Sequence, residues 1–161
     1  MSAEDRSDEQ GEVRKHRVDL PEGHAAGARQ HVILVADDDA LVRNLVTLML
    51  QQDGYVVLSA ADGREGLELS RSYPGSIDLL ITDMVMPRMN GSDLCAHLLE
   101  ERPGIKMLVM SGADTSEIIS QNANLPFLPK PFDGWALKSR VRDILAAEMR
   151  NPPDRLQCPA G

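Results

Sequence analysis

Four short apolar runs of the chain each end in residues whose side chains can do chemistry. These residues are the acidic triplet Asp37–Asp39, the single carboxylate Asp83, the hydroxyl residue Ser111 and the lysine Lys130. In open α/β sheets, the carboxyl ends of parallel strands meet at one edge, and ligands bind in the crevice beyond it. If the apolar runs are parallel strands, several acids, one hydroxyl and one ammonium group share a single crevice.

This combination of groups suits phosphoryl transfer. Several carboxylates at one point repel one another, so a cation is needed to keep them ionised together. Mg²⁺ prefers a few carboxylates, a carbonyl oxygen and water molecules. Asp83 can accept phosphate covalently as an acyl phosphate, while Lys130 and the Ser111 hydroxyl can bind the remaining phosphate oxygens. The residues therefore predict a site that holds and transfers one phosphoryl group with Mg²⁺.

Each of these residues also has a purely structural interpretation. Asp38 and Asp39 are favoured helix caps, Ser111 can cap a following helix, and Lys130 can be a solvated surface charge. Because the other members of the constellation are present, we assign the capping role to Asp39 and the metal role to Asp37 and Asp38.

Apolar periodicity predicts the elements that position this site. Short continuous apolar runs are typical of buried parallel strands, and they cover residues 32–36, 55–60, 77–83, 105–110 and 126–128. Helical spacing and stop signals predict helices within 41–53 and over 63–72, 92–102, 115–121 and 133–149. We expect the last helix to bury Trp135, Leu137, Val141, Ile144 and Leu145. Strands that alternate with helices through short turns imply an α/β fold with a parallel sheet.

Composition limits the classes of protein to consider. A chain of 161 residues is expected to form one domain with a substantial core. We place that domain at residues 31–149, between a disordered N-terminal tail at 1–30 and a C-terminal tail at 150–161. The alternative for the N-terminal tail is a partner-binding arm.

Charge and cysteine usage narrow the expected partners and location. The net charge of −8 argues against a nucleic-acid surface. Neither a membrane span nor a signal peptide is apparent. Cys95 and Cys158 lie far apart, which indicates a reduced protein without a disulfide framework or zinc site. We therefore expect a cytoplasmic location and no membrane partner; the sequence makes no prediction of oligomeric state.

Four motifs of the chain resemble the receiver domain of bacterial two-component response regulators. Residues 33–39 resemble the family's first strand and acidic pair, and residues 83–91 match its phosphoacceptor loop, D-x-x-M-P-x-M-[DN]-G. Residues 110–112 match the hydroxyl position, and residues 130–132 match the lysine motif. The resemblance runs from His31 to Ala147. It implies a doubly wound, five-stranded parallel sheet of the (βα)5 flavodoxin-like type, with strand order 2-1-3-4-5.

The resemblance implies a role for each site residue. Asp83 is implied as the phosphoacceptor, with a histidine kinase or histidine phosphotransfer protein as donor. Asp38, Asp83 and the backbone carbonyl of Val85 are implied as direct Mg²⁺ ligands, with Asp37 acting mainly through a coordinated water. Lys130 is implied to pair with the phosphate.

The resemblance also implies a switch. Ser111 would hydrogen-bond the phosphate and swing toward it on activation, while the ring of Phe127 turns inward. A cis peptide bond is implied before Pro131. Val85 and Ala113 stand where the family tunes attack by water, and both are apolar. We therefore expect a long-lived phosphoryl group.

Some residues depart from the family pattern. Residues 122–126 lack the usual Gly-Ala before the fifth strand, so we expect a fourth helix that is either short or mobile. Phe127 has no hydroxyl group where many relatives carry tyrosine, which removes any switch contact made through that hydroxyl.

The leading hypothesis is a phosphorylation-controlled switch with a changed surface for a downstream protein. It is not an enzyme beyond its own Mg²⁺-dependent phosphoryl transfer and dephosphorylation. Met1 and the two tails favour a stand-alone receiver over one cut from a hybrid histidine kinase. One alternative is a pseudo-receiver that binds partners without phosphorylation. The other is a phosphatase of the haloacid dehalogenase type, but Asp37–Asp39 supplies its D-x-D pattern without the expected cap insertion.

Overall fold

The computed structural model describes residues 29–112 and 125–147. Within these ranges the strands are β1 (Val32–Ala36), β2 (Val56–Ala60), β3 (Leu79–Asp83), β4 (Lys106–Ser111) and β5 (Phe127–Pro129). The helices are α1 (Ala40–Gln52), α2 (Gly63–Ser72), α3 (Gly91–Glu101) and α5 (Gly134–Ala146). The predicted tails and the predicted helix at 115–121 lie outside the described residues, except for Arg29 and Gln30 at the end of the N-terminal tail.

All strand pairs are parallel, and the order across the sheet is β2-β1-β3-β4-β5. The order confirms the predicted flavodoxin-like topology. The boundaries of all five strands agree with the sequence prediction to within two residues. The main consequence of the differences is that Ser111 is the last residue of β4 rather than the first residue after it.

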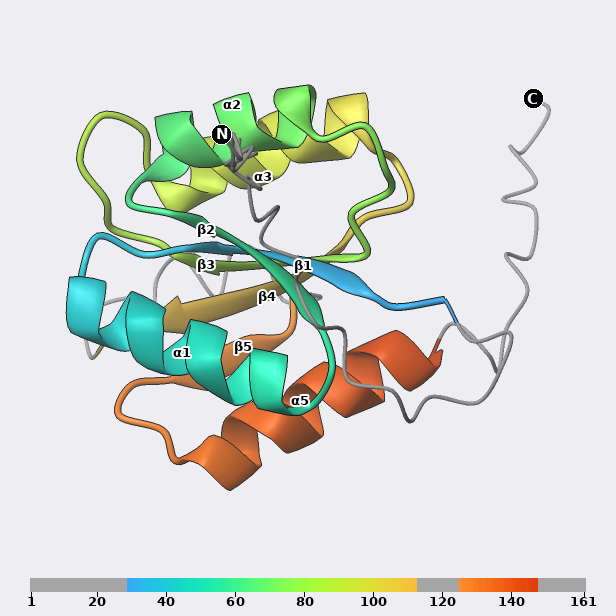
Figure 1. Cartoon of the computed structure of the whole chain (residues 1–161). Helices are drawn as coiled ribbons and strands as arrows, with labels where there is room; N and C mark the ends of the chain where they lie inside the picture. The colour runs from blue at the N-terminus through green and yellow to red at the C-terminus, as the bar shows by residue number, and fades with distance from the viewer. Residues whose placement is uncertain (1–28, 113–124, 148–161) are drawn as a thin grey trace, which may run out of the picture.

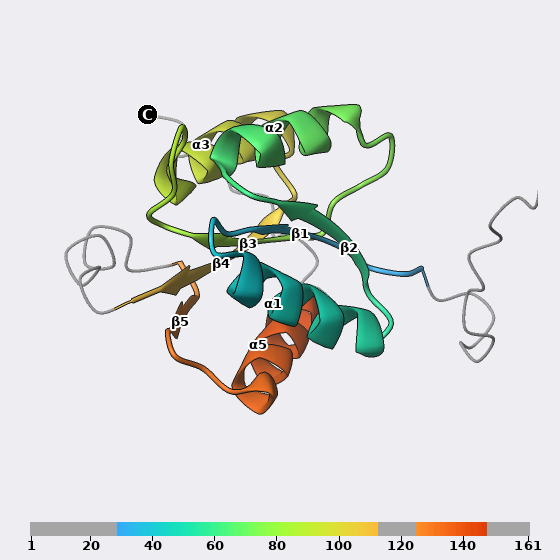
Figure 2. The same cartoon turned by 60° about the vertical axis from the view of Figure 1, so that its left-hand side comes forward.

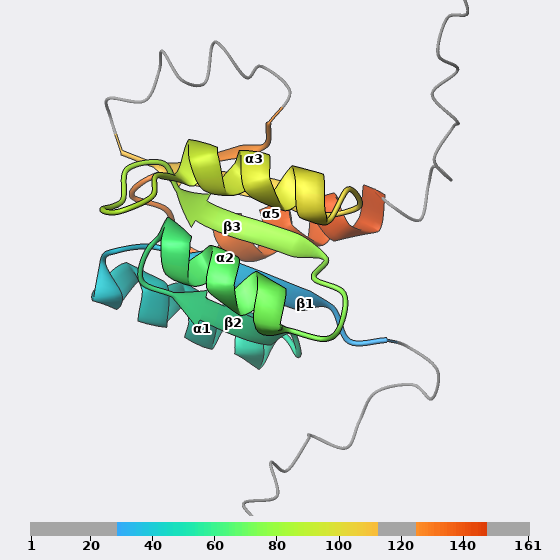
Figure 3. The ribbon, with the colours of Figure 1, turned by 90° about the horizontal axis from the view of Figure 1, so that it is seen from above.

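The sheet is the middle of three layers, with α2 and α3 on one face and α1 and α5 on the other (Figures 1 and 2). The view in Figure 3 shows α2 and α3 crossing in front of the strands. Each face has its own apolar core. Leu67, Leu94 and Leu98 pack on one face, and Val46, Leu137 and Val141 pack on the other. Burial on both faces explains why β1 is apolar throughout.

Each helix begins with a side chain that accepts a hydrogen bond from the backbone of its first turn. The capping residues are Asp39 for α1, Asp62 for α2, Asn90 for α3 and Asp133 for α5. Such a cap contributes about 1 kcal/mol to stability. The capping role predicted for Asp39 is confirmed.

The predicted burial of Trp135 is wrong, because 75% of this residue is exposed. The face of α5 toward the sheet carries Leu137, Val141 and Leu145, which are buried. Trp135 precedes Leu137 by two positions, which is about 200° around a helix of 3.6 residues per turn. Its ring therefore points away from the sheet.

Helix α1 carries more apolar residues than the sheet can cover. Val46 and Leu50 are buried, whereas Leu41, Leu45 and Leu48 are 82%, 50% and 55% exposed. These three leucines follow a spacing of four and three residues, so they form one stripe along the helix.

Among the described helices, none combines the length and apolar character needed to cross a membrane.

Candidate functional site

The strand register brings Asp37 and Asp83 together. Ala36 at the end of β1 is opposite Thr82 of β3. The residue that follows each of them in the chain is an aspartate, so the carboxylates of Asp37 and Asp83 leave neighbouring strand ends at the same level. Both strands are central in the sheet, and the crevice lies where helices leave on opposite faces.

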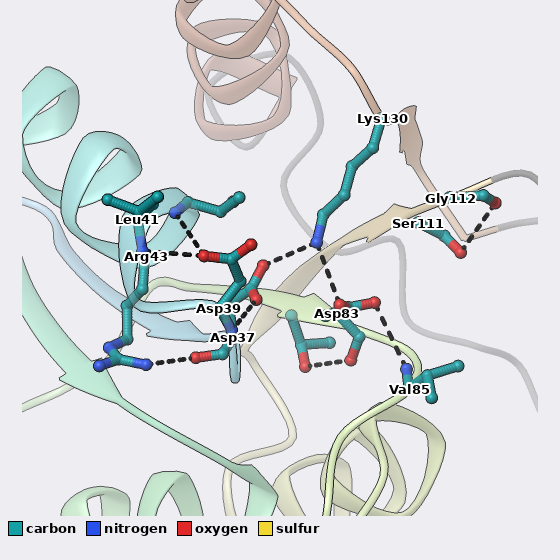
Figure 4. Close-up of polar contacts among 11 residues, drawn as sticks. Asp37, Asp39, Leu41, Arg43, Asp83, Val85, Ser111, Gly112 and Lys130 are labelled. Carbon is teal, nitrogen blue, oxygen red and sulfur yellow. Dashed lines mark hydrogen bonds and ion pairs between the residues drawn. The ribbon is translucent and has the colours of Figure 1, made fainter.

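The same edge receives Ser111 and Lys130. Ser111 is opposite Pro129 of β5, and the backbone N–H of Lys130 donates to the carbonyl of Ser111 over 2.8 Å. The peptide bond between Lys130 and Pro131 is cis, which confirms that prediction. Because of this register, Lys130 lies at the same edge of the sheet as the acids. Its long side chain extends from there toward Asp37 and Asp83 (Figure 4).

Three carboxylates form a compact acidic cluster. Asp37, Asp38 and Asp83 each offer one oxygen, and these oxygens all lie within 4.8 Å of one another. Asp37 is buried, Asp83 is partly buried and Asp38 is exposed. The Nζ of Lys130 donates to Oδ2 of Asp37 at 2.9 Å and to Oδ2 of Asp83 at 3.0 Å (Figure 4). The ammonium group thus offsets part of the charge of the cluster.

Burial and pairing shift the pKa values of the buried Asp37 and of the partly buried Lys130. Burial raises the pKa of Asp37 above its ordinary value, although hydrogen bonds from Lys130 and from the Asp39 N–H lower it. Burial alone would lower the pKa of Lys130, but its bonds to Asp37 and Asp83 outweigh burial and raise it. Lys130 is therefore protonated at neutral pH. The raised pKa of Asp37 indicates that one ammonium group does not fully compensate for desolvation of its carboxylate.

Asp37 is held in place by two groups that follow it in the chain, one from Asp39 and one from Arg43 of α1. The Asp39 N–H donates to its Oδ1 at 2.8 Å, and Nη1 of Arg43 donates to its carbonyl at 2.6 Å. The Asp39 carboxylate is turned to the helix, where it accepts from the N–H groups of Leu41 and Val42. The triplet is thereby divided into one capping residue and two residues that face the cluster.

The remaining predicted site residues lie around this cluster. The Val85 N–H donates to Oδ1 of Asp83 at 3.3 Å, while the Val85 residue is 69% exposed. Ser111 is buried, and its hydroxyl lies 3.4 Å from the Gly112 carbonyl. Phe127 is partly buried and lies opposite Val109, two residues before Ser111 on β4. Phe127 is therefore beside the strand end rather than in the acidic cluster.

The loop after Asp83 folds back on the strand. The Gly91 N–H donates to the Met84 carbonyl at 3.0 Å, and a Cβ on Gly91 would overlap the Asp83 carbonyl. Only glycine permits this approach, which explains the glycine that ends the motif. Met84 and Met86 are buried beneath the loop, so they act as apolar anchors.

Two residues of this region were missed by sequence reasoning. The guanidinium of Arg88, in the loop, forms an ion pair with the buried carboxylate of Asp62 at the start of α2. The capping role of Asp62 could be read from Asp-Gly before a helical run, but nothing in the local sequence relates it to Arg88. The pair exists because the two turns meet in space.

Comparison with known proteins identifies the family of this chain. The family model described as the response regulator receiver domain matches residues 33–142. The chain belongs to the response regulator receiver domain family. Receiver domains are signalling domains of two-component systems.

The chain matches only part of the length of several curated relatives. The chain is 38% identical over 117 residues to the sensor kinase CckA of Brucella abortus, covering 71% of this chain and 12% of the kinase. It is 34% identical over 132 residues to the alkaline phosphatase synthesis transcriptional regulatory protein SphR of Synechococcus elongatus, covering 76% of this chain and 51% of that protein. The receiver thus spans about half the length of the regulator and a small part of the kinase.

Solved structures of receivers share the fold. A response regulator receiver domain protein from Clostridium thermocellum has a TM-score of 0.67 and 26% identity, covering 74% of this chain and 98% of that one. The receiver domain of the hybrid histidine kinase CckA has a TM-score of 0.57 and 33% identity, covering 71% and 98%.

The acidic cluster of this receiver has the chemistry of a Mg²⁺ site. Its donors are carboxylate oxygens close enough to share one ion, and Mg²⁺ is a hard cation that binds through one or two carboxylates and retains water. The raised pKa of Asp37 identifies an electrostatic cost that a divalent cation would reduce. The residues present therefore fit the ion.

Proposed function

We propose that this receiver is a phosphorylation-dependent switch in which Asp83 accepts a phosphoryl group from a phosphohistidine. The observation that carries the proposal is the position of Lys130, whose ammonium group bonds to Asp37 and Asp83 within the acidic cluster. A cation beside the acceptor can bind phosphoryl oxygens that carry negative charge in the transition state. The Lys130 side chain is only 22% exposed and pairs with both acids, which argues against its interpretation as a solvated surface charge.

The transfer forms one bond and breaks another. A carboxylate oxygen of Asp83 attacks phosphorus, the bond from phosphorus to the histidine nitrogen breaks, and the electron pair of that bond stays on the nitrogen. The product is an acyl phosphate on Asp83. Lys130 then pairs with a phosphoryl oxygen in place of the Asp83 oxygen.

Mg²⁺ would neutralise charge on the transferring group and bring it in line with Asp83. Asp37, Asp38, Asp83 and the backbone carbonyl of Val85 would hold the ion. The compact acidic cluster supports the three carboxylates in this role. The exposed position of Val85 beside Asp83 is compatible with a carbonyl ligand from the loop.

Ser111 and Phe127 are proposed to convert phosphorylation into a changed surface. Ser111 ends the strand next to β3, so a small movement of its hydroxyl can follow a phosphoryl group on Asp83. Phe127 is partly buried on the adjoining strand β5. If Ser111 moves toward the phosphoryl group, the space that it leaves would let the ring of Phe127 move inward.

The proposed donor is a histidine kinase or a histidine phosphotransfer protein, and the downstream partner is a protein. A relative named as a sensor kinase supports the donor class. The exposed apolar stripe of Leu41, Leu45 and Leu48 supports a docking surface, because α1 begins directly after the acidic triplet. An apolar helix face beside a reactive site suits a helical donor domain.

Acetyl phosphate with Mg²⁺ tests the proposal without any partner. We expect intact-mass analysis to show a gain of one phosphoryl group in the wild type and none in Asp83→Asn. Asp93→Asn, which changes an acid in the first turn of α3, is the matched control and should be phosphorylated normally. A wild type that stays unmodified would support the pseudo-receiver instead, and turnover of a free phosphoester would support the phosphatase.

A further inference from the structure

The loop between Asp83 and α3 contains a turn in an uncommon backbone conformation. Arg88 has a φ of 64°, and the Met89 N–H donates to the Pro87 carbonyl over 2.7 Å. This bond between residues two apart closes a three-residue γ-turn. A residue other than glycine keeps a positive φ when its surroundings hold it there. The contacts of Arg88 must therefore explain the turn.

The side chain of Arg88 reaches the start of α2. Its guanidinium pairs with Oδ2 of Asp62, and Oδ1 of the same carboxylate accepts the Glu65 N–H at 2.9 Å. The Asp62 side chain is 1% exposed, against 65% for that of Arg88. Burial works to raise the pKa of Asp62, but the bonds from Glu65 and Arg88 outweigh it and lower the pKa. Asp62 is therefore a buried, ionised group with a fixed orientation.

A backbone contact accompanies the ion pair. The Gly63 N–H donates to the carbonyl of Met89 over 3.2 Å. A Cβ on Gly63 would lie 2.8 Å from Cγ of Met89 and would clash with the Met89 carbonyl as well. The γ-turn is thus pressed directly against the first residue of α2, with the ion pair and the hydrogen bond on adjacent residues of each segment.

The turn belongs to a closed loop that includes Val85. Because the Gly91 N–H is bonded to the Met84 carbonyl, residues 84–91 form a ring whose ends meet beside Asp83. Met84 and Met86 anchor the first half in the core, and Arg88 anchors the second half on α2. A change in the turn alters the path of the backbone between these anchors.

We propose that Asp62 and Arg88 are positioning residues that fix the loop of residues 84–91, and through it the Val85 carbonyl, for Mg²⁺ binding. This inference rests on the proposed function, which assigns that carbonyl to the ion. Among the residues that the structure describes, no hydrogen bond or ion pair joins the side chain of either residue to the acidic cluster. Their effect is transmitted through the γ-turn, since the ion pair holds Arg88 at positive φ.

Hydrogen exchange of the protein without metal tests whether the ion pair of Asp62 and Arg88 fixes the loop of residues 84–91. Arg88→Gln removes the charge while Asp62 remains to cap α2, and Asp62→Asn keeps a capping oxygen while removing the charge. We expect amides of 84–91 to exchange several-fold faster in both variants. The double variant should match either single one, because both remove the same interaction. Arg64→Gln is the control, because Arg64 is exposed on α2 and pairs with Glu68.

Calorimetric titration with Mg²⁺ tests whether the ion pair supports metal binding. We expect the dissociation constant to rise about tenfold in Arg88→Gln, the lower end of the effect of groups that support a metal ligand from outside. Arg88→Lys, which restores a cation, should recover part of the affinity. Urea unfolding identifies a global loss of stability, which would raise exchange throughout the sheet and not in the loop alone.

The outcomes separate this inference from the proposed function. The inference would be overturned if, in Arg88→Gln, the amides of residues 84–91 exchanged at the wild-type rate and Mg²⁺ bound with the wild-type affinity. Additive effects of Asp62→Asn and Arg88→Gln would also overturn it, since they would show independent roles. A wild-type protein that does not bind Mg²⁺ would overturn the proposed function, while the exchange comparison would still decide whether the pair holds the loop.

Discussion

The ammonium group of Lys130 donates a hydrogen bond to the carboxylate of Asp83 over 3.0 Å, although the two residues are 47 positions apart in the chain. Lys130 lies between Asp83 and Asp37, so it holds a position at which it both offsets acidic charge and faces the proposed acceptor. Removal of the ammonium group is therefore expected to strengthen metal binding and to slow phosphorylation.

Lys130→Met should separate these two effects. Mg²⁺ should bind several-fold more tightly, because no ammonium group competes for the carboxylates. Phosphorylation by acetyl phosphate should slow by about a hundredfold, the usual loss when one donor to a developing negative charge is removed. Calorimetry and a time course of intact mass measure the two quantities. Lys138→Met, which removes a lysine paired with Asp53, is the control; equal changes in both variants would contradict the prediction.

Asp37→Asn should stabilise the protein in the absence of metal. The folded-state pKa of Asp37 is raised above its ordinary value of 3.8 by burial. Between this ordinary pKa and the higher pKa of the folded state, the folded protein binds more protons than the unfolded chain. The contribution of Asp37 to stability therefore falls as pH rises through that window. At neutral pH the variant should gain about 1 kcal/mol, a common size for such gains, and should lose Mg²⁺ affinity.

Urea titrations of both proteins from acidic to neutral pH check this expectation. The difference in free energy of unfolding should grow in favour of Asp37→Asn as pH rises. A variant that is less stable than the wild type at neutral pH would show that the bond to Lys130 outweighs burial.

Leu45→Glu should impair transfer from a protein donor and leave the small-molecule reaction intact. Leu45 and Leu41 are half or more exposed on α1, so a charge there disrupts an apolar contact without disturbing the core. We expect slower phosphorylation by a phosphorylated histidine phosphotransfer protein and an unchanged rate with acetyl phosphate. Leu99→Glu, at a leucine 47% exposed on α3, is the control. Equal rates from the protein donor in both variants would argue against α1 as the docking surface.

The phosphorylated protein should be long-lived. Val85 is two residues beyond Asp83 and its apolar side chain is exposed, so it offers no hydrogen bond to a water that attacks the acyl phosphate. Val85→Asn should shorten the lifetime, because an amide can orient such a water. Loss of the phosphoryl mass after removal of acetyl phosphate measures both lifetimes. A wild-type lifetime of seconds would contradict the prediction.

Much of the fold and site could be predicted from local sequence. Continuous apolar runs indicate strands buried on both faces, and turn residues mark where they end, so Asp37, Asp83, Ser111 and Lys130 could be assigned to one sheet edge. The role of Asp39 as a cap was equally local, since it depends on the first turn of the following helix. Periodicity and turn chemistry act over a few residues and are therefore visible in the chain.

Contacts between distant segments needed the tertiary structure. Whether Trp135 is buried depends on the rotation of α5 against the sheet, and periodicity alone did not reveal it. The pairing of Asp62 with Arg88 joins residues 26 positions apart through the meeting of two turns. The sequence by itself determined which groups stand at the strand ends, because residue type and period are local. Only the packing of strands and helices decided which groups touch, because distances across the crevice depend on every element that surrounds it.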